Sequence, residues 1–408
     1  MAYEEKLFHD SKAFLRETLS ERMQTYGFKN MGRLELFLWD LEIFLQIQSI
    51  LGDRVVLKGG AAVQFYLPME AQRTSVDIDM IFFGSKDEIE ETLTKITEKL
   101  SENDAYFHFK PHKPKDPKTD LPLYTYFTEI PSVLTRGELN KHDDCEQDAF
   151  QEIKIEFIQE DKRAEYTRKT GKDIFAVSSP FEYQVLPISH LFADKLTTIG
   201  CNTIGVQNDR MDEQVKQFYD VMIISRYCYE NLNFDNVREK YLARAEMEWR
   251  DRKKDEPFSL DSIISDVSAQ LDRYAAVDDG MDAELKKHIG DFKGLYLNSR
   301  IEFDPQNVSC AALRIKMMYS LMMSGQNWDC VRSAMQIEDT LELTHLSGRE
   351  KGTMIKELRT ALVEGFAQYS STPAKILKGK GLKRVFWAVA QPDNLEEIKT
   401  MIQSKLKV

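Results

Sequence analysis

The stretch from Leu57 to Phe83 constrains the fold of this chain more than any other. It starts in an apolar run that ends in the glycine pair Gly59-Gly60, and it closes on a run in which Asp77 and Asp79 alternate with apolar residues. The apolar runs predict buried strands, and the glycine pair, which has no Cβ atoms, lets the backbone turn tightly and approach a bound group. We therefore expect a strand, a glycine turn, a helix and a second strand, with a phosphate-accepting corner at the turn.

The two aspartates form a candidate metal site. Side chains two residues apart on a strand point to the same face, so Asp77 and Asp79 are expected roughly 7 Å apart on one face. Hard cations such as Mg²⁺ take oxygen ligands and are usually held by one or two carboxylates plus substrate phosphates. An isolated Asp-x-Asp is more often the solvated end of a strand. Here the aspartates stand among apolar residues, where an unpaired carboxylate is costly to bury, and this setting favours a site for Mg²⁺ or Mn²⁺.

A glycine turn followed by Asp-x-Asp on a strand resembles the catalytic core of the DNA polymerase β type nucleotidyltransferase superfamily. Within it, the segments 57–62 and 73–80 are similar to the AbiEii/AbiGii nucleotidyltransferase toxins, the toxin halves of bacterial abortive-infection toxin-antitoxin pairs. Sixteen residues separate Gly60 from Asp77, which is longer than the usual gap of the superfamily and in keeping with the toxin branch. The resemblance covers roughly residues 30 to 225, and it implies an NTP substrate, a divalent metal and a cognate antitoxin as a partner.

A third acid is expected on a neighbouring strand. The run from Ile153 to Ile158 alternates, with Lys154 and Glu156 on one face and apolar residues on the other. Members of the superfamily often place an acid there, so Glu156 is the candidate to complete the metal shell or to accept the proton of an attacking hydroxyl. The alternative, a glutamate at the strand edge that faces water, remains open.

Two further residues are carried over from the resemblance alone. The AbiEii family has a lysine in a helix that holds the phosphates of the nucleotide, and it has a later aspartate in a short helical segment. Lys195 and Asp220 match these positions, while Gln217 stands where the pattern has its first acid, and the insertion 202–210 departs from the compact form. A lone lysine on a helix is ordinarily solvent-facing, so its role here rests on the resemblance.

The implied reaction moves a nucleoside monophosphate from an NTP to an acceptor hydroxyl, with pyrophosphate as the leaving group and a two-metal arrangement that stabilises both the attacking and the leaving oxygen. Asp77, Asp79 and Glu156 would hold the metal, and with Lys195 and Asp220 they form the predicted catalytic set. Lys58 and Arg73 are supporting cations or, equally, salt-bridge partners at the strand ends. The predicted nucleotide contacts are Lys58, Gly59, Gly60, Arg73, Ser75 and Lys195.

The resemblance points to the 3′ end of tRNA as the acceptor. A net charge of −12 excludes a protein that coats nucleic acid indiscriminately, so local basic segments would have to contact RNA. The candidates are the loop 110–118, the segment 162–172 and the cluster 375–384. Transfer to a protein or a small molecule is the second enzymatic hypothesis, and nucleotide binding without turnover is the non-enzymatic one.

The fold class predicted from these features is α+β: a small mixed-sheet nucleotidyltransferase core flanked by helices, then a helical C-terminal domain. Ser85 to Glu88 has the form of a helix capping box, and beyond about residue 230 apolar residues recur at helical spacing. We expect a domain boundary between residues 228 and 229. Five scattered cysteines, no leader-like N-terminus and no long apolar run predict a cytoplasmic protein that has no membrane segment.

Overall fold

The computed structural model describes residues 3–101, 106–112, 122–139, 148–253, 255–326 and 328–406. The basic residues 113–118 and the acidic patch 143–146 therefore lie outside the described residues. The chain forms two compact units that are discontinuous in sequence. The first contains residues 1–194, 246–256 and 291–301, and the second contains residues 195–245, 257–290 and 302–408. The expected domain boundary at residue 228 stays a prediction.

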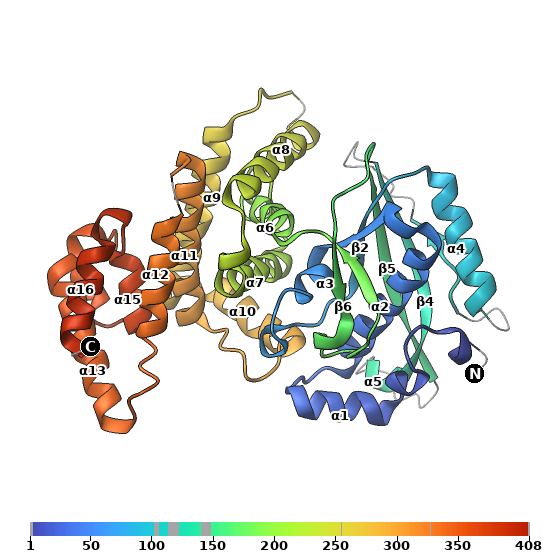
Figure 1. Ribbon diagram of the computed structural model, residues 1–408, viewed down its shortest axis with the longest axis horizontal. Helices are drawn as coiled ribbons and strands as arrows, with labels where there is room; N and C mark the ends of the chain where they lie inside the picture. The colour runs from blue at the N-terminus through green and yellow to red at the C-terminus, as the bar shows by residue number, and fades with distance from the viewer. Residues whose placement is uncertain are drawn as a thin grey trace. The chain divides into compact units, whose positions relative to one another are not determined.

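One seven-stranded mixed sheet forms the centre of the first unit (Figure 1). Its order is β3-β4-β5-β2-β1-β7-β6. The strands are β1 (Val55–Lys58), β2 (Asp77–Phe82), β3 (Lys110–Pro111), β4 (Leu123–Thr135), β5 (Asp148–Gln159), β6 (Thr167–Thr170) and β7 (Glu182–Val185). Strand β2 runs antiparallel to β1 and parallel to β5, so the glycine turn and both acid-bearing strands lie side by side in the middle of the sheet.

Helices flank this sheet, as expected. They are α1 (Arg16–Tyr26), α2 (Met31–Leu51), α3 (Gly59–Gln64), α4 (Lys86–Leu100) and α5 (Arg136–Leu139). Helix α2 is buried along most of its length and contacts β1, β2, β4, β5 and β7, so it forms the main core layer against the sheet. Helix α4 packs beside α2, and it begins with the predicted capping box: Ser85 accepts from the backbone N–H of Glu88, whose carboxylate accepts from that of Ser85.

The second unit is helical. Helices α6 (Ile188–Thr197), α8 (Phe234–Arg252) and α10 (Ala283–Tyr296) contain residues of both units. Its other helices are α7 (Met211–Tyr227), α9 (Leu260–Ala275), α11 (Pro305–Ser324), α12 (Asp329–Thr340), α13 (Gly348–Phe366), α14 (Ala374–Leu377), α15 (Leu382–Val389) and α16 (Leu395–Leu406). Helix α11 packs against α7, α9 and α15 and carries the core of this unit. The predicted fold class, α+β with a helical C-terminal region, is therefore confirmed.

A membrane-spanning helix was not expected. Within the described ranges, every helix is either too short or too polar to cross a bilayer.

Candidate active site

The glycine turn between β1 and α3 lies directly against the second aspartate of β2. Gly59 has a φ of +69°, a backbone conformation that favours glycine. A Cβ added there would lie 2.8 Å from Cγ of Asp79 and closer still to its Oδ2. Only glycine allows the turn to approach the carboxylate this closely. Asp79 also pairs with Lys58 across the antiparallel strands, so the turn and the carboxylate meet at one end of β1.

The second glycine packs against Arg73. A Cβ added at Gly60 would lie 3.2 Å from Cζ of Arg73 and closer to its Nη2. Gln64, one helical turn later, donates to the carbonyl of Gly60 (2.7 Å) and accepts from the backbone N–H of Arg73 (2.9 Å). Arg73 itself is fully buried, and its Nη1 donates to the carbonyl of Thr74 (2.7 Å). Arg73 and Gln64 thus brace the turn, and contact of Arg73 with a nucleotide stays a prediction.

The segment that leads into β2 is held by residues far along the chain. The N–H of Thr74 donates to the carbonyl of Tyr296 (3.2 Å), and Arg73 forms an isolated β-bridge with Leu297. Asn298 adds a hydrogen bond from its Nδ2 to the carbonyl of Glu70 (3.0 Å). These contacts are within the first unit. Ser75, a predicted nucleotide contact, is buried in this segment.

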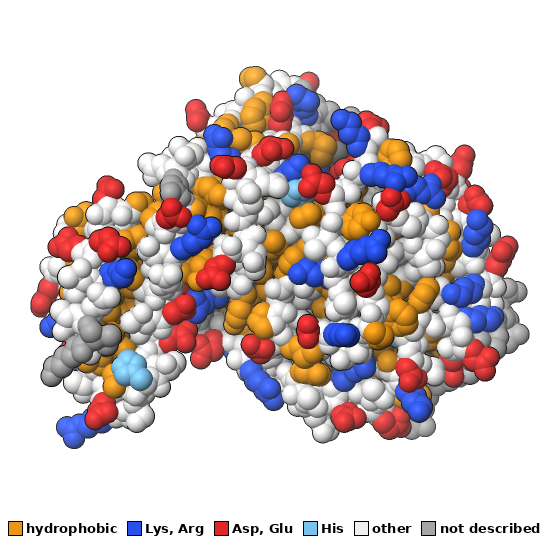
Figure 2. All heavy atoms as spheres, in the orientation of Figure 1, with side chains coloured by type: hydrophobic (Ala, Val, Ile, Leu, Met, Phe, Trp, Pro, Cys, Tyr) orange, Lys and Arg blue, Asp and Glu red, His pale blue; other side chains and the backbone are white. Residues whose placement is uncertain are grey.

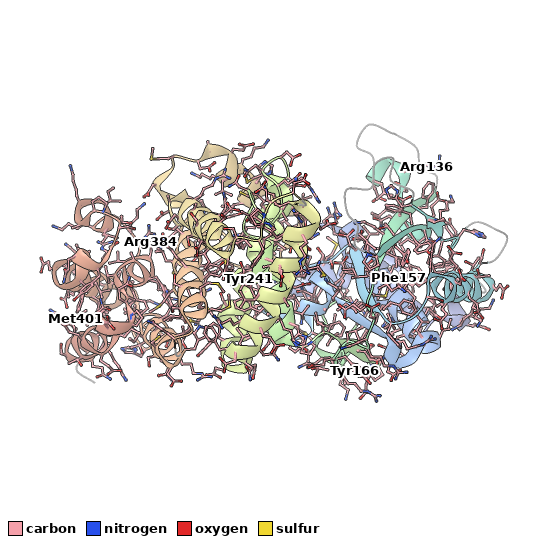
Figure 3. All side chains as sticks on the ribbon, turned by 90° about the horizontal axis from the view of Figure 1, so that it is seen from above. Arg136, Phe157, Tyr166, Tyr241, Arg384 and Met401 are labelled. Carbon is pink, nitrogen blue, oxygen red and sulfur yellow. The ribbon has the colours of Figure 1, made fainter. Side chains whose placement is uncertain are left out.

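Strand register brings the three predicted metal-binding acids onto adjacent strands. In the parallel pairing of β2 with β5, Asp77 lies beside Lys154 and Asp79 lies beside Glu156. Paired residues on neighbouring strands are about 5 Å apart and point to the same face. These four side chains are partly exposed, whereas Ile78 and the other residues that alternate with them are buried. Phe157, which follows Glu156, lies within the sheet in Figure 3.

Glu156 is nevertheless engaged by its own neighbours. Its Oε2 lies 2.8 Å from Nζ of Lys154, and its Oε1 accepts a hydrogen bond from Oγ1 of Thr125 on β4 (3.1 Å). No group of three or more His, Cys, Asp or Glu side chains in the described part of the chain is close enough to hold a metal ion. The structure thus places Glu156 beside Asp79 without bringing the three carboxylates together, and a metal shell of three acids stays a prediction.

Lys58 occupies the end of β1 as a buried ion-pair partner. Its Nζ lies 2.6 Å from Oδ2 of Asp194, which comes from helix α6. The structure thus shows Lys58 in a salt bridge, and contact of Lys58 with a nucleotide stays a prediction. Asp194 was not identified from the sequence, because nothing in its local pattern shows that α6 brings it to β1.

The second unit carries the other two residues taken from the resemblance. Nζ of Lys195 lies 2.8 Å from Oδ2 of Asp220, and the side chains are 8% and 0% exposed. Lys195 also donates to Oε1 of Gln217 (2.6 Å), whose amide donates to Glu213. The structure therefore brings Lys195, Asp220 and Gln217 into one cluster, in which Lys195 and Asp220 are buried and Gln217 is half-buried. Their role in catalysis stays a prediction.

Glu213 completes this cluster one helical turn before Gln217. Burial acts to raise the pKa of Glu213, but the charges of Lys216 and Lys195 and the hydrogen bond from Gln217 outweigh it and hold the pKa below its ordinary value. A carboxylate that stays ionised thus stands near the position at which the family pattern has an acid and this chain has Gln217. The sequence contained a signal for Glu213: it lies four residues before Gln217, so the two side chains are neighbours on one face of the helix.

A divalent cation fits the donors on β2. Asp77 and Asp79 supply hard oxygen ligands on a partly exposed face of β2, and the missing side chain of Gly59 lets the backbone lie against the Asp79 carboxylate. Mg²⁺ is usually held by one or two carboxylates, several waters and substrate phosphates, so two protein carboxylates are enough for it.

Comparison with known proteins identifies the family. A sequence profile described as the nucleotidyl transferase AbiEii toxin of a type IV toxin-antitoxin system matches residues 43–298, more than half of the chain. The chain belongs to the AbiEii nucleotidyltransferase toxin family. Membership makes it a transferase enzyme and a toxin of the nucleotidyltransferase class, as the glycine turn and the Asp-x-Asp strand indicated. No curated protein matches its sequence.

The AbiEii chain is similar in structure to solved proteins, two of which follow. JHP933 from Helicobacter pylori is 14% identical, with a TM-score of 0.40 over 75% of this chain and 96% of the other. MenT4, a nucleotidyltransferase toxin from Mycobacterium tuberculosis, is 12% identical, with a TM-score of 0.36 over 76% of this chain and 99% of the other.

Proposed function

We propose that this AbiEii toxin transfers a nucleoside monophosphate from an NTP to the 3′ end of tRNA, in a reaction that depends on a divalent cation held by Asp77 and Asp79. The observation that carries the proposal is the close approach of the Gly59 turn to Asp79, which leaves no room for a side chain between backbone and carboxylate. Gly59 and Gly60 are buried in this turn, and their backbone N–H groups would bind a phosphate next to the place where the cation would bind.

The proposed chemistry is an in-line displacement. The oxygen of the acceptor hydroxyl bonds to the α-phosphorus, the bond from that phosphorus to the bridging oxygen of the β-phosphate breaks, and pyrophosphate leaves. The hydroxyl proton passes to water or to Glu156. When bound, the cation would supply charge neutralisation at the phosphates. The backbone of Gly59 and Gly60 would orient the triphosphate, since a fixed geometry lowers the barrier of such a step.

Charge distribution narrows the proposed RNA contacts. On the face in Figure 2 acidic and basic side chains are interspersed, as expected for an acidic protein. In the cluster 375–384, Lys380 pairs with Asp278 (3.2 Å) and Lys383 with Glu342 (2.9 Å). Arg384 is buried and lies among the helices of the second unit in Figure 3. That cluster is therefore partly neutralised, and its exposed Lys375 and Lys378 remain candidates. In the segment 162–172, Arg163 pairs with Asp53 and Arg168 with Glu182, so the exposed Lys162 and Lys172 are the candidates there.

The test is transfer of label. Purified protein is incubated with each α-labelled NTP, Mg²⁺ and total tRNA, and the RNA is separated on a gel. We expect label on tRNA with one preferred NTP, and loss of transfer by at least 100-fold in Asp79→Asn, which keeps the shape and removes the charge. Asp87→Asn, on the exposed first turn of α4, is the matched control and should transfer normally.

Each failure of this test has its own meaning. Label on a protein or a small molecule from extract, with none on tRNA, would keep the catalytic core and replace the acceptor. Nucleotide binding with no pyrophosphate released would contradict the proposed reaction and favour the non-enzymatic hypothesis.

A further inference from the structure

Helix α13, in the second unit, has a buried face and an exposed face. Its buried face, which includes Leu358 and Leu362, packs against α14, α15 and α16. Its exposed face borders a hollow of about 690 Å³, which Lys405 of α16 also lines. The hollow belongs to the second unit alone, so it is separate from the glycine turn and the strand that carries Asp77 and Asp79.

Four charged side chains of α13 line this hollow: Arg349, Lys356, Glu357 and Glu364. All four are exposed, and within the described part of the chain none of them forms an ion pair. Opposite charges three or four residues apart stabilise an isolated helix, but no two of these four have that spacing. Their charges are therefore available to a partner outside the chain.

The order of these charges along α13 is self-complementary. Arg349 lies seven residues before Lys356, and Glu364 lies seven residues after Glu357. Reversing the helix about the midpoint between Lys356 and Glu357 therefore exchanges each cation with a carboxylate. In an antiparallel pair of such helices related by a two-fold axis, Arg349 lies at the level of Glu364 of the second copy, and Lys356 at the level of its Glu357.

The residues between these charges are small, and the same reversal exchanges them in pairs. Thr353 exchanges with Thr360, and Gly352 exchanges with Ala361. Small side chains allow two helices to pack at the short end of the usual 8–10 Å between axes. A Cβ added at Gly352 would meet nothing within 4 Å, so packing inside the described chain does not require the glycine that weakens this helix.

We propose that the exposed face of α13 binds α13 of a second copy of this chain, antiparallel and about a two-fold axis, with Arg349 of each copy paired to Glu364 of the other. RNA fits this hollow less well, because Glu357 and Glu364 would repel phosphates. One helix from each copy makes a small interface, so the dimer is weak and reversible. The proposal does not depend on the proposed function.

The test is the association state of the full-length protein, measured by sedimentation velocity from about 1 µM to about 100 µM, the range expected for a small interface. The parent chain should pass from monomer to dimer. Glu364→Arg places two arginines at the same level at both ends of the interface, and it should weaken the dimer at least about tenfold. Glu364→Arg combined with Arg349→Glu should restore the dimer, because opposite charges face each other again.

Glu98→Arg is the matched control. It makes the same change of charge on the exposed face of α4, where Glu98 also forms no ion pair within the described residues, and it should dimerise like the parent. Thermal unfolding of each variant shows that it is folded.

Cysteine cross-linking tests the orientation. Under mild oxidation, a mixture of Thr353→Cys and Thr360→Cys chains should form a disulfide-linked dimer. Each variant alone should not, because in the antiparallel pair identical positions lie seven residues, about 10 Å, apart along the helix. The parent under the same oxidation controls for its own cysteines.

The contrary outcomes are distinct. A parent that stays monomeric over the whole range would overturn the proposal, and so would a folded double variant that fails to recover the dimer. Cross-links in either single cysteine variant would contradict the antiparallel arrangement. A monomeric parent whose affinity for tRNA falls in Arg349→Glu would assign the hollow to RNA instead. None of these measurements involves transfer of label, so their failure leaves the proposed function intact.

Discussion

At the scale of single residues, Gly59 is a position that tolerates few substitutions. Two separate causes act there: a backbone conformation that disfavours other residues and a carboxylate that occupies the place of a Cβ. Gly325 has nearly the same φ, +68°, but nothing lies within 4 Å of its added Cβ. The two glycines therefore allow the two causes to be separated.

We predict that Gly325→Ala lowers the free energy of unfolding by about 1–2 kcal/mol, the cost of a left-handed conformation for a residue with a Cβ. Gly59→Ala should cost clearly more, because Asp79 must also move, and it should abolish Mn²⁺ binding. Urea denaturation and a titration with Mn²⁺ measure the two effects. Equal losses of stability in the two variants, with Mn²⁺ binding retained, would show that the contact with Asp79 is unimportant.

The ion pair of Lys195 with Asp220 gives a second prediction at this scale. Removing one partner of a buried pair leaves an uncompensated charge, so Asp220→Ala should lower the free energy of unfolding by about 3–5 kcal/mol. Lys195→Met combined with Asp220→Leu should restore most of that loss, since neither member of the ion pair is then left as an unpaired charge. If the double variant is as unstable as the single one, packing and not charge accounts for the loss. Lys95→Met, which breaks an exposed pair, should change stability by less than about 1 kcal/mol.

At the scale of elements, helix α2 carries two buried glutamates with opposite pKa shifts. Burial raises the pKa of Glu35 above its ordinary value of 4.5, and hydrogen bonds from Ser132, Val133 and Gln151 offset this only in part. Burial acts on Glu42 in the same direction, but the hydrogen bond and charge of His9, with backbone N–H groups, lower the pKa of Glu42 below 4.5. The two glutamates of this one helix thus change the stability of the fold with pH in opposite directions.

The signs give a prediction for the melting temperature. Glu35 binds its proton more tightly in the folded state, so its contribution is present below pH 4.5 and is lost as pH rises through the folded pKa. The contribution of Glu42 is present above pH 4.5 and is lost as pH falls through its lowered pKa. We expect Glu35→Gln to flatten the decline of the melting temperature above pH 4.5, and Glu42→Gln to flatten the decline below it. The reverse assignment of the two variants would contradict the shifts.

At the scale of the whole molecule, net charge governs how an RNA can be bound. With a formal charge of −12, the chain repels tRNA at long range, and affinity must come from a few exposed basic residues. Lys162 and Lys172 are exposed in the segment 162–172 of the first unit. Each phosphate contact contributes about one unit to the slope of log affinity against log salt.

We predict that Lys162→Gln combined with Lys172→Gln raises the KM for tRNA and lowers the salt slope by about two units, with kcat unchanged. Lys86→Gln combined with Lys95→Gln removes the same charge from α4 and should leave the slope as it is. The measurement is the transfer rate at several KCl concentrations. An equal change in both double variants would mean that only the net charge matters.

The sequence alone was sufficient for the features that depend on neighbouring residues. The glycine pair, the alternation around Asp77 and Asp79, and the capping box of α4 are local patterns, because turn geometry, strand periodicity and helix capping act over a few residues. The same local motif was enough to indicate the family and the α+β fold. Lys195 and Asp220 were found only through the resemblance, and the structure adds that they pair directly.

Contacts between distant parts of the chain required the folded structure. Lys58 meets Asp194, the segment around Thr74 is held by Tyr296, and Glu156 is held by Thr125. Lys154 and Glu156 are only two residues apart, but their position beside the two aspartates of β2 depends on the pairing of β5 with β2. Strand register and helix packing arise from the burial of many side chains at once, so no short pattern encodes which polar groups they bring together.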